Sequence, residues 1–285
     1  MMKLDNFAVF ILSHGRADNI KTLKALKKGN YTGKWYIVID NEDKQAKEYY
    51  KRYGKENVIM FDKLKISKTF DVGDNFTERR TVVYARNACF EIAKKLGLKY
   101  FLELDDDYSQ FSYRAIRNNK FVKINCKQLD KIFSSMINFL DVSGAITVAM
   151  AQGGDFIGGK DNGNYKKGLL RKAMNTFFCS TDRFFQFVGR VNEDVNTYVI
   201  NAIKGNLLFT VTRISINQAT TQAQCGGMTE QYVNSGTYLK SFYSVMYAPS
   251  CVSIHLMGDK HKRIHHKVSW NNCAPKIISY RFKKE

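Results

Sequence analysis

Short apolar runs that end in polar turns are the feature that most restricts how this chain can fold. Residues 7–12 read Phe-Ala-Val-Phe-Ile-Leu, and similar runs occupy residues 35–39, 58–61 and 100–104. Consecutive apolar positions are typical of parallel strands that are buried on both faces. Because helical segments with short connections separate these runs, the pattern predicts a doubly wound α/β sheet with right-handed crossovers.

The second half of the chain has a similar but less regular pattern. An amphipathic helix is predicted over residues 129–140, and strands over 145–151 and 207–216. The segments 176–179 and 184–188 favour a hairpin, whereas the basic residues 109–125 follow no clear period. Upstream, the helix that begins at Ala85-Arg86-Asn87 is expected to end at Gly97, a residue typical of helix C-termini.

Three consecutive carboxylates, Asp105, Asp106 and Asp107, directly follow the apolar run at 100–104. Ligands of open α/β sheets bind outside the carboxyl ends of the strands. Hard divalent cations prefer carboxylate oxygens, often together with phosphates of a substrate. The turn therefore indicates a metal or phosphate site, and the alternative is a solvated acidic turn, since Asp is common in turns.

Charged residues also follow other predicted strands. His14 and Arg16 lie between the first strand and a helix, where backbone amides and an arginine can face phosphate or a base. Asp40 ends the second strand, the position at which such folds hold a ribose or base. Arg86, at a helix start, can reach a phosphate or the aspartates. The alternatives are a loop histidine at His14 and helix capping by Asp40.

Two further groups are candidates for chemistry. Glu193 and Asp194 open a helix, where carboxylates either stabilise the helix dipole or serve as a general base. Four of the five histidines lie between residues 255 and 266 among lysines and arginines, namely His255, His261, His265 and His266. Histidine is a common metal ligand, so this segment is either part of a metal–phosphate site or a basic surface tail.

The charge of the chain favours a polyanionic partner. The 45 Lys and Arg exceed the 26 Asp and Glu, which gives a net charge of +19. Nucleic acid is the first candidate, followed by a membrane surface and an anionic glycan, although a lysine-rich composition without functional meaning remains an alternative. Scattered cysteines argue against a disulfide framework or a structural zinc site. No apolar run is long enough to span a membrane and no signal peptide is recognisable, so a cytoplasmic location is expected.

The order of these motifs over residues 7–268 resembles the GT-A fold of nucleotide-sugar-dependent glycosyltransferases. The resemblance rests on His14-Gly15-Arg16, Asp40, Ala85-Arg86-Asn87, Leu104 to Asp107 as an Asp-X-Asp motif, and Asn192-Glu193-Asp194. The acidic strand end and the closing segment 264–270 are further similar to the phage and TET-associated glycosyltransferases proposed to decorate 5-hydroxymethylpyrimidines in DNA.

This resemblance implies a GT-A-like, Rossmann-like α/β fold, with a mixed, mainly parallel sheet flanked by helices. It implies a single catalytic domain over residues 1–285. Residues 1–108 would bind the nucleotide sugar, residues 109–254 the acceptor, and residues 255–285 would form a basic, histidine-rich C-terminal segment.

The resemblance also assigns roles to the candidate residues. Asp105 would face the ribose and Asp107 would bind Mn²⁺ or Mg²⁺, with Asp106 as an alternative. A C-terminal histidine would complete the metal shell, His265 or His266 before His255. Asp194, or else Glu193, would deprotonate the acceptor hydroxyl.

The function implied is the transfer of a sugar, most simply from a UDP-sugar, to a 5-hydroxymethylpyrimidine in phage DNA, within the host cytoplasm. One alternative is a transferase of the same fold that acts on a cell-envelope glycan or a protein. Others are a metal-dependent nuclease that uses Asp105 to Asp107 and a DNA-binding module.

Overall fold

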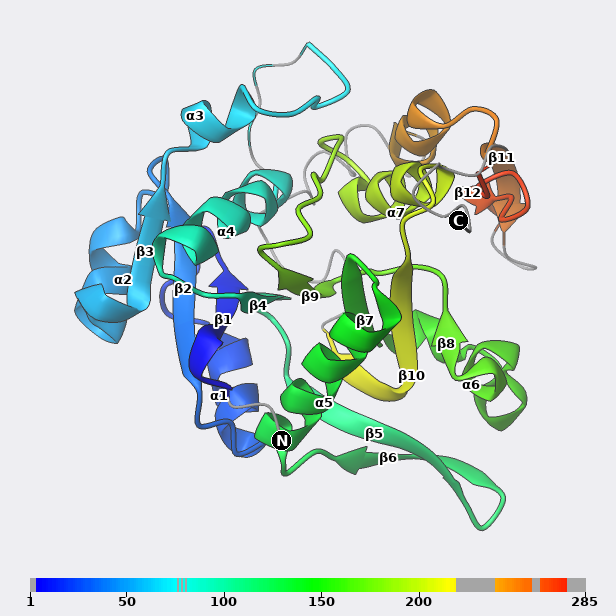
Figure 1. The fold of residues 1–285 in the computed structure, drawn as a ribbon, viewed down its shortest axis with the longest axis horizontal. Coiled ribbons are helices and arrows are strands. Elements are labelled where there is room, and N and C mark those ends of the chain that lie inside the picture. Colours follow the sequence, from blue (N-terminus) through cyan, green and yellow to red (C-terminus); the bar gives the residue numbers. More distant parts are fainter. Residues whose placement is uncertain are drawn as a thin grey trace, which may run out of the picture.

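Ten strands form one central sheet in the computed structural model of the chain (Figure 1), which describes residues 4–75, 77, 79, 81–218, 239–257 and 262–275. The strand order is β3-β2-β1-β4-β9-β7-β10-β5-β6, and β8 pairs with β10. A separate two-stranded sheet contains β11 (Val252–Met257) and β12 (Arg263–Val268). In the described part of the chain, no helix combines the length and the apolar character that crossing a membrane requires.

The four apolar runs of the N-terminal half form the parallel part of the sheet. They are β1 (Phe7–Leu12), β2 (Lys34–Asp40), β3 (Val58–Phe61) and β4 (Tyr100–Asp105). The intervening helices are α1 (Lys21–Lys28), α2 (Ala46–Tyr53), α3 (Lys63–Ser67) and α4 (Val83–Lys95), with 3-10 turns η1 (Leu4–Asn6) and η2 (Lys55–Asn57). Since β3, β2, β1 and β4 are all parallel, their carboxyl ends lie at one edge of the sheet.

The remaining strands extend the sheet with both orientations. They are β5 (Gln110–Arg117), β6 (Lys120–Asn125), β7 (Thr147–Ala151), β8 (Leu169–Leu170), β9 (Thr176–Ser180) and β10 (Leu208–Asn217). β7 and β10 are parallel, whereas β9 runs antiparallel to both of its neighbours, β4 and β7. The predicted α/β fold with a mixed sheet flanked by helices is confirmed.

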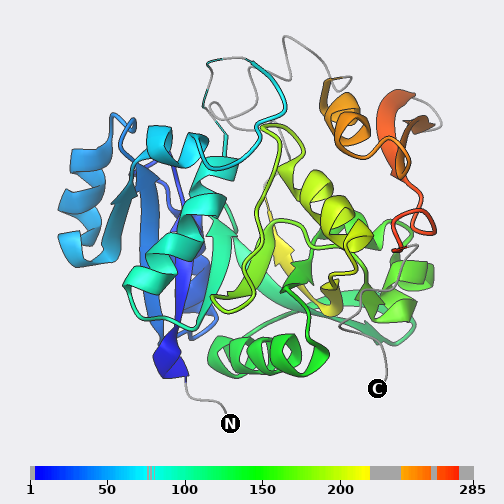
Figure 2. The ribbon, with the colours of Figure 1, turned by 45° about the horizontal axis from the view of Figure 1, so that its top comes forward.

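Helices cover both faces of this sheet because its strands are apolar on both sides. Along β1, Phe7, Val9 and Ile11 pack in one core cluster with α1, α2 and α5 (Leu129–Ser143). The residues between them, Ala8 and Phe10 among them, pack with α4 and α7 (Glu193–Ile203) in the other. Figure 2 shows α5 in green, apart from α4 in teal and α7 in yellow-green.

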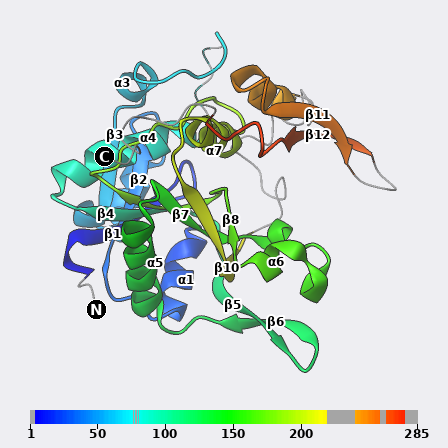
Figure 3. The ribbon, with the colours of Figure 1, turned by 45° about the vertical axis from the view of Figure 1, so that its right-hand side comes forward.

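One sequence prediction for the second half is wrong. Residues 184–188 form no strand, and β9 pairs with β4 and β7 rather than with that segment. The basic residues 109–125, which show no clear period, fold as the β5–β6 hairpin. Figures 1 and 3 both show this hairpin projecting beyond the rest of the sheet.

Short elements connect the strands around β7 and β10. They are η3 (Gly153–Phe156), η4 (Gly159–Asp161) and α6 (Gly163–Lys167). Residues 239–247 are helical and lie, with β11 and β12, beside α7 (Figures 1 and 3). The contacts from Asn192 to the Lys240 carbonyl and the His266 ring hold this C-terminal unit against the start of α7.

Gly97 ends α4 as predicted. Its φ of +66° is in the left-handed region, and the amides of Gly97 and Leu98 donate back to the carbonyls of Lys94 and Ala93. Since a Cβ there would meet no atom within 4 Å, only backbone strain opposes substitution. We expect Gly97→Ala to lower the free energy of unfolding by about 1–2 kcal/mol, measured by urea denaturation. Gly153→Ala, whose Cβ also meets open space at a residue with ordinary φ, is the matched control and should cause no such loss.

Candidate functional site

A cavity of about 250 Å³ opens at the carboxyl ends of β1, β2 and β4. The charged side chains on its wall come from the loops that follow these strands and from the start of α3: His14, Arg16, Asp40, Lys63, Asp105, Asp106 and Asp107. Parallel strands bring their carboxyl ends to one sheet edge, which is why residues so distant in sequence meet here. Six of the predicted site residues therefore line one space.

Asp40 is the centre of a charged group at one end of the cavity. Its Oδ2 lies 2.7 Å from Nδ1 of His14, and its Oδ1 lies 3.3 Å from Nζ of Lys63. The amide of Glu42 donates to the same Oδ1 at 3.1 Å. The hydrogen bond from Asp40 raises the pKa of His14, and in turn His14 and Lys63 lower the pKa of Asp40 against the opposing effect of burial.

Asp106 joins the acidic turn to the loop after β1. Its Oδ2 accepts a hydrogen bond from Oγ of Ser13 at 2.6 Å, and its Oδ1 accepts one from Nη1 of Arg16 at 2.9 Å. The turn is also bound to α1, because Oγ1 of Thr22 donates to the Asp105 carbonyl and accepts from the Tyr108 amide. Both carboxylate oxygens of Asp106 are thus engaged within the protein.

Asp107 differs from Asp106 in having an oxygen without a partner. Its Oδ1 is buried and accepts no hydrogen bond from any residue that the structure describes. Burial, together with the charges of Asp105 and Asp106, raises the pKa of Asp107 to about 6. A buried carboxylate oxygen without a partner is costly unless a ligand neutralises it, which suits a cation site.

Arg86 lies beneath the acidic turn rather than on the cavity wall. Its side chain is 2% exposed, and its guanidinium packs 4.7 Å from the centre of the Phe177 ring. Nη2 donates to Oδ1 of Asp105 at 3.1 Å, and Nε donates to Oε1 of Glu193 at 3.4 Å. Arg86 therefore contacts Asp105, one of the aspartates expected from the sequence as its partners, and links it to the start of α7.

The carboxylates at the start of α7 are in different environments. Burial and the charge of Asp194 raise the pKa of Glu193 to about 7, although Arg86 opposes this shift. Oδ1 of Asp194 accepts a hydrogen bond from the Val195 amide at 2.7 Å, a contact typical of a helix start. Neither residue lines the cavity, and Glu193 is the one that Arg86 connects to Asp105.

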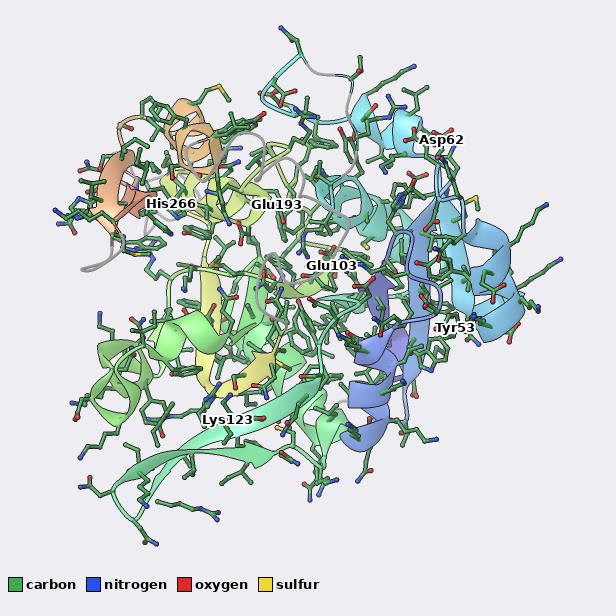
Figure 4. All side chains as sticks on the ribbon, turned by 180° about the vertical axis from the view of Figure 1, so that it is seen from behind. Tyr53, Asp62, Glu103, Lys123, Glu193 and His266 are labelled. Atoms are coloured by element: carbon green, nitrogen blue, oxygen red, sulfur yellow. The ribbon has the colours of Figure 1, made fainter. Side chains whose placement is uncertain are left out.

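Glu103 is a buried acid that the sequence analysis missed. It is fully buried in β4, 3.6 Å from Nη1 of Arg86, and neither carboxyl oxygen has a hydrogen-bond partner among the described residues. Burial raises its pKa to about 8. Figure 4 shows Glu103 and Glu193 in the interior of the molecule. Alternation along β4 points Glu103 and Asp105 to the same face, and this period is the signal that could have found Glu103.

Lys63 and Tyr108 are also missing from the sequence prediction. Lys63 is 3% exposed and pairs with Asp40, and it comes two residues after β3, at the same sheet edge as the other strand ends. Tyr108 directly follows the three aspartates, and its hydroxyl lies 3.2 Å from Oδ2 of Asp105 and also contacts the Asn175 carbonyl. The short distance in sequence from the end of β3 or β4 is the feature by which each residue could have been predicted.

The C-terminal histidines lie apart from the cavity wall. Nδ1 of His266 lies 3.2 Å from the amide nitrogen of Asn192, and burial lowers the pKa of His266 to about 4. His265 Nδ1 lies 2.7 Å from the His266 carbonyl, and the exposed His255 pairs with His265 across β11 and β12. His266 thus reaches the start of α7 through Asn192 (Figure 4), and His261 lies outside the described residues.

The carboxylates of the cavity fit a hard divalent cation. In the described ranges, no three His, Cys, Asp or Glu side chains form a group that could hold a metal ion by themselves. Mg²⁺, however, is usually held by one or two carboxylates together with substrate phosphates. Asp107, with its buried oxygen without a partner, offers one such ligand, and Asp105, whose two oxygens contact Arg86 and Tyr108, offers a second through its remaining lone pairs.

Comparison with known proteins identifies the family. Residues 7–227 match the family model described as TET-Associated Glycosyltransferase. The chain belongs to the TET-associated glycosyltransferase family. The enzyme class predicted from the motifs, a glycosyltransferase, is therefore confirmed. None of the curated proteins matches this TET-associated glycosyltransferase in sequence.

Several solved structures have a similar fold at low sequence identity. A mannosyltransferase from Pyrobaculum calidifontis in complex with GDP-Man and Mn²⁺ is 11% identical, with a TM-score of 0.48 over 86% of this chain and 73% of its own. Glucosyl-3-phosphoglycerate synthase from Mycobacterium tuberculosis with Mn²⁺, UDP and phosphoglyceric acid is 7% identical, with a TM-score of 0.45 over 92% and 87%. S. aureus TarS 1-349 with UDP-GlcNAc is 12% identical, with a TM-score of 0.42 over 85% and 66%.

The His14–Asp40 pair gives a direct test of the cavity's electrostatics. We expect Asp40→Asn to lower the pKa of the His14 imidazole in this glycosyltransferase, because the strongest stabilisation of its protonated form is the Asp40 hydrogen bond. The raised pKa means that this pair stabilises the fold fully below about pH 6.5 and loses its effect as the pH rises through the folded-state pKa. NMR titration of the ring measures the shift, and Asp18→Asn, an exposed carboxylate of the same loop, should leave it unchanged.

Proposed function

We propose that this glycosyltransferase moves a sugar from a UDP-sugar to the hydroxyl of a 5-hydroxymethylpyrimidine in DNA. The observation that carries the proposal is the cavity itself, in which the Asp40 group and the acidic turn face one space of about 250 Å³. A nucleoside diphosphate has a base and ribose at one end and a charged diphosphate at the other. It therefore needs hydrogen-bonding groups such as those around Asp40 and also a cation-binding acidic turn. A metal-dependent nuclease would need only the acidic turn.

The donor would lie across the carboxyl ends of β1, β2 and β4. His14, Asp40 and Lys63 offer hydrogen-bond donors and acceptors for the base and ribose, and Arg16 adds a positive charge beside Asp106. Asp105 and Asp107 would hold Mn²⁺ or Mg²⁺ near the diphosphate. When bound, such a cation supplies Lewis-acid stabilisation of the negative charge that develops on the leaving nucleoside diphosphate.

Glu193, which lies outside the wall of the donor cavity and is linked to Asp105 by Arg86, is the proposed general base. Its pKa of about 7 lets it take a proton from the acceptor hydroxyl near neutral pH and then release it to solvent. Arg86 would act as a positioning residue, since it contacts Asp105 and Glu193 at once and is itself buried. Asp194 is the alternative base. His265, His266 and His255 are proposed as further metal ligands, to be reached by movement of the C-terminal unit.

Support for a DNA acceptor comes from charge and from the family resemblance. A net charge of +19 suits a polyanion, and counterion release makes such binding strong at low salt. Proteins of the resembled group are proposed to act on hydroxymethylated bases. We propose that residues 1–108 bind the donor, that residues 109–254 contribute the acceptor side, and that the enzyme works in the cytoplasm of an infected host.

The proposal is tested by transfer to defined DNA. The protein is incubated with Mn²⁺, a panel of UDP-sugars and DNA containing 5-hydroxymethylcytosine or 5-hydroxymethyluracil, and the digested nucleosides are weighed by mass spectrometry. A sugar mass on the base supports the proposal. UDP release without an adduct would move the acceptor to a glycan or protein, and DNA cleavage without any donor would favour the nuclease.

A further inference from the structure

The β5–β6 hairpin is a narrow two-stranded arm. Its strands are joined by Asn118 and Asn119 alone, with φ of +47° and +58°. Positive φ at both positions is typical of a type I′ turn, the tightest hairpin connection. Residues 110–113 of β5 also pair with β10, so the two-stranded part consists of residues 114–117 and their partners in β6, with a length of about 13 Å.

The arm is fixed to the rest of the molecule along its length. Nε of Arg114 donates to Oγ of Ser215 at 2.7 Å, and its guanidinium lies 4.4 Å from the centre of the Phe156 ring. Phe121, one residue pair from the turn, packs against the rings of Phe156 and Tyr165, and Nζ of Lys160 donates to Oδ1 of Asn119 in the turn at 2.8 Å. These contacts bury Arg114 and hold the arm in one orientation, so its exposed side is a preformed surface.

The arm is strongly and uniformly basic. Residues 110–127 contain five Lys and Arg and no Asp or Glu. Arg117, Lys120 and Lys123 are exposed, and the four residues at the tip, 117–120, are all polar or charged. Exposed cations without neighbouring acids suit the phosphates of nucleic acid.

The arm is continuous with the rim of the cavity. β5 begins three residues after Asp107, and its first residue, Gln110, pairs with Asn217 at the end of β10. The next residue along, Gln218, lines the cavity. β5 therefore connects the rim of the cavity to the cations at the tip, so a duplex that lies along the arm reaches the opening in which the proposed chemistry takes place.

We propose that the β5–β6 hairpin is the arm by which this protein docks on duplex DNA, with Arg117, Lys120 and Lys123 against the phosphates. The proposal rests on the proposed function, because it names the surface that presents the DNA acceptor. In this proposal the three residues contact DNA phosphates and take no part in sugar transfer.

The test compares two triple variants with the same change of charge. The arm variant carries Arg117→Ala, Lys120→Ala and Lys123→Ala. The control carries Lys44→Ala, Lys47→Ala and Lys51→Ala, exposed residues at and just before α2, on the opposite side of the molecule in Figure 1. Circular dichroism melting checks that both variants fold, and fluorescence anisotropy with a labelled duplex gives Kd over a range of salt concentrations.

We expect the arm variant to bind DNA about tenfold or more weakly at low salt, with the slope of log K against log salt reduced by about three, one for each phosphate that the variant no longer neutralises. Transfer to a free 5-hydroxymethyl nucleoside should be unchanged. The control should keep the original slope. Equal Kd and equal slope in both variants would contradict the proposal that the arm docks on DNA.

The outcomes separate this inference from the proposed function. A protein that binds DNA through the arm but adds no sugar to any hydroxymethylated substrate keeps the docking arm and contradicts the proposed function. A protein that modifies DNA equally well in both variants keeps the proposed function and contradicts the docking arm.

Discussion

Replacing Asp107 with asparagine lowers the kcat of sugar transfer by about 10²–10³-fold, the usual loss when one group that stabilises transition-state charge is removed. The amide has nearly the size of the carboxylate but no charge to hold a cation beside the donor diphosphate. The buried, unpartnered Oδ1 is the reason for choosing Asp107 over its neighbours. Single-turnover transfer assays in Mn²⁺ measure the loss, and a variant as fast as the unchanged protein contradicts the assignment.

The same substitution should have the opposite effect on stability in EDTA. The pKa of Asp107 rises from 3.8 to about 6 on folding, so the folded protein holds this proton more tightly than the unfolded chain. The carboxylate therefore begins to destabilise the fold as the pH rises above about 4, and its full penalty is present above about pH 6. We expect Asp107→Asn to raise Tm at pH 8 and to leave it unchanged at pH 4.

Asp106→Asn is the control for both measurements. Asp106 already accepts hydrogen bonds from Ser13 and Arg16, so its charge is compensated within the protein. Its replacement should lower Tm at pH 8, in contrast to the replacement of Asp107. A rise in Tm for both variants would mean that the whole acidic turn is strained by mutual repulsion.

The parallel part of the fold could be predicted because its signal is local. Four apolar runs separated by helices leave little choice other than a buried parallel sheet, and the structure has these strands where the sequence places them. The segment 184–188 resembles a strand in sequence because it is equally apolar. Its phenylalanines pack on rings of α4 and β9 instead of joining the sheet, for example Phe185 on Phe90 and Phe187 on Phe177.

The β5–β6 hairpin could not be predicted because the partners of its apolar residues are distant in sequence. Phe121 is partly buried against Phe156 and Tyr165, which come from the short elements after β7. Arg114 reads as one more exposed cation in the sequence, yet it is buried against Ser215 and Phe156. A sequence pattern shows charge but not which cations a later segment will cover.

The candidate site could be predicted only in part, because the sequence indicates where its residues lie but not which side chains they contact. That His14, Asp40 and Asp105 would meet follows from the parallel strand ends, which the sequence does predict. Which carboxylate is left for a ligand depends on side-chain partners. Asp106 is used by Ser13 and Arg16 and Asp107 is not, a difference that no spacing of three identical residues could reveal.

Glu193→Gln should lower kcat by about 10²–10⁴-fold, the range typical of a lost general base. In the unchanged enzyme we expect kcat to rise with pH through about 7 and to level off above it, since only the deprotonated carboxylate can accept the proton. Glutamine does not titrate, so the residual kcat of the variant should not rise with pH in this way. Rates of transfer from pH 5 to pH 9 measure both effects.

The Asp194→Asn variant shows whether Glu193 or Asp194 is the general base. The charge of Asp194 is one of the causes that raise the pKa of Glu193. Its removal should therefore shift the rise of kcat to lower pH, while most of the rate remains. If kcat no longer rises with pH in Asp194→Asn but still does so in Glu193→Gln, Asp194 is the base instead. Arg86 strengthens the choice of Glu193, because its single buried guanidinium fixes this carboxylate relative to Asp105, whereas Asp194 is held by the amide of its own helix.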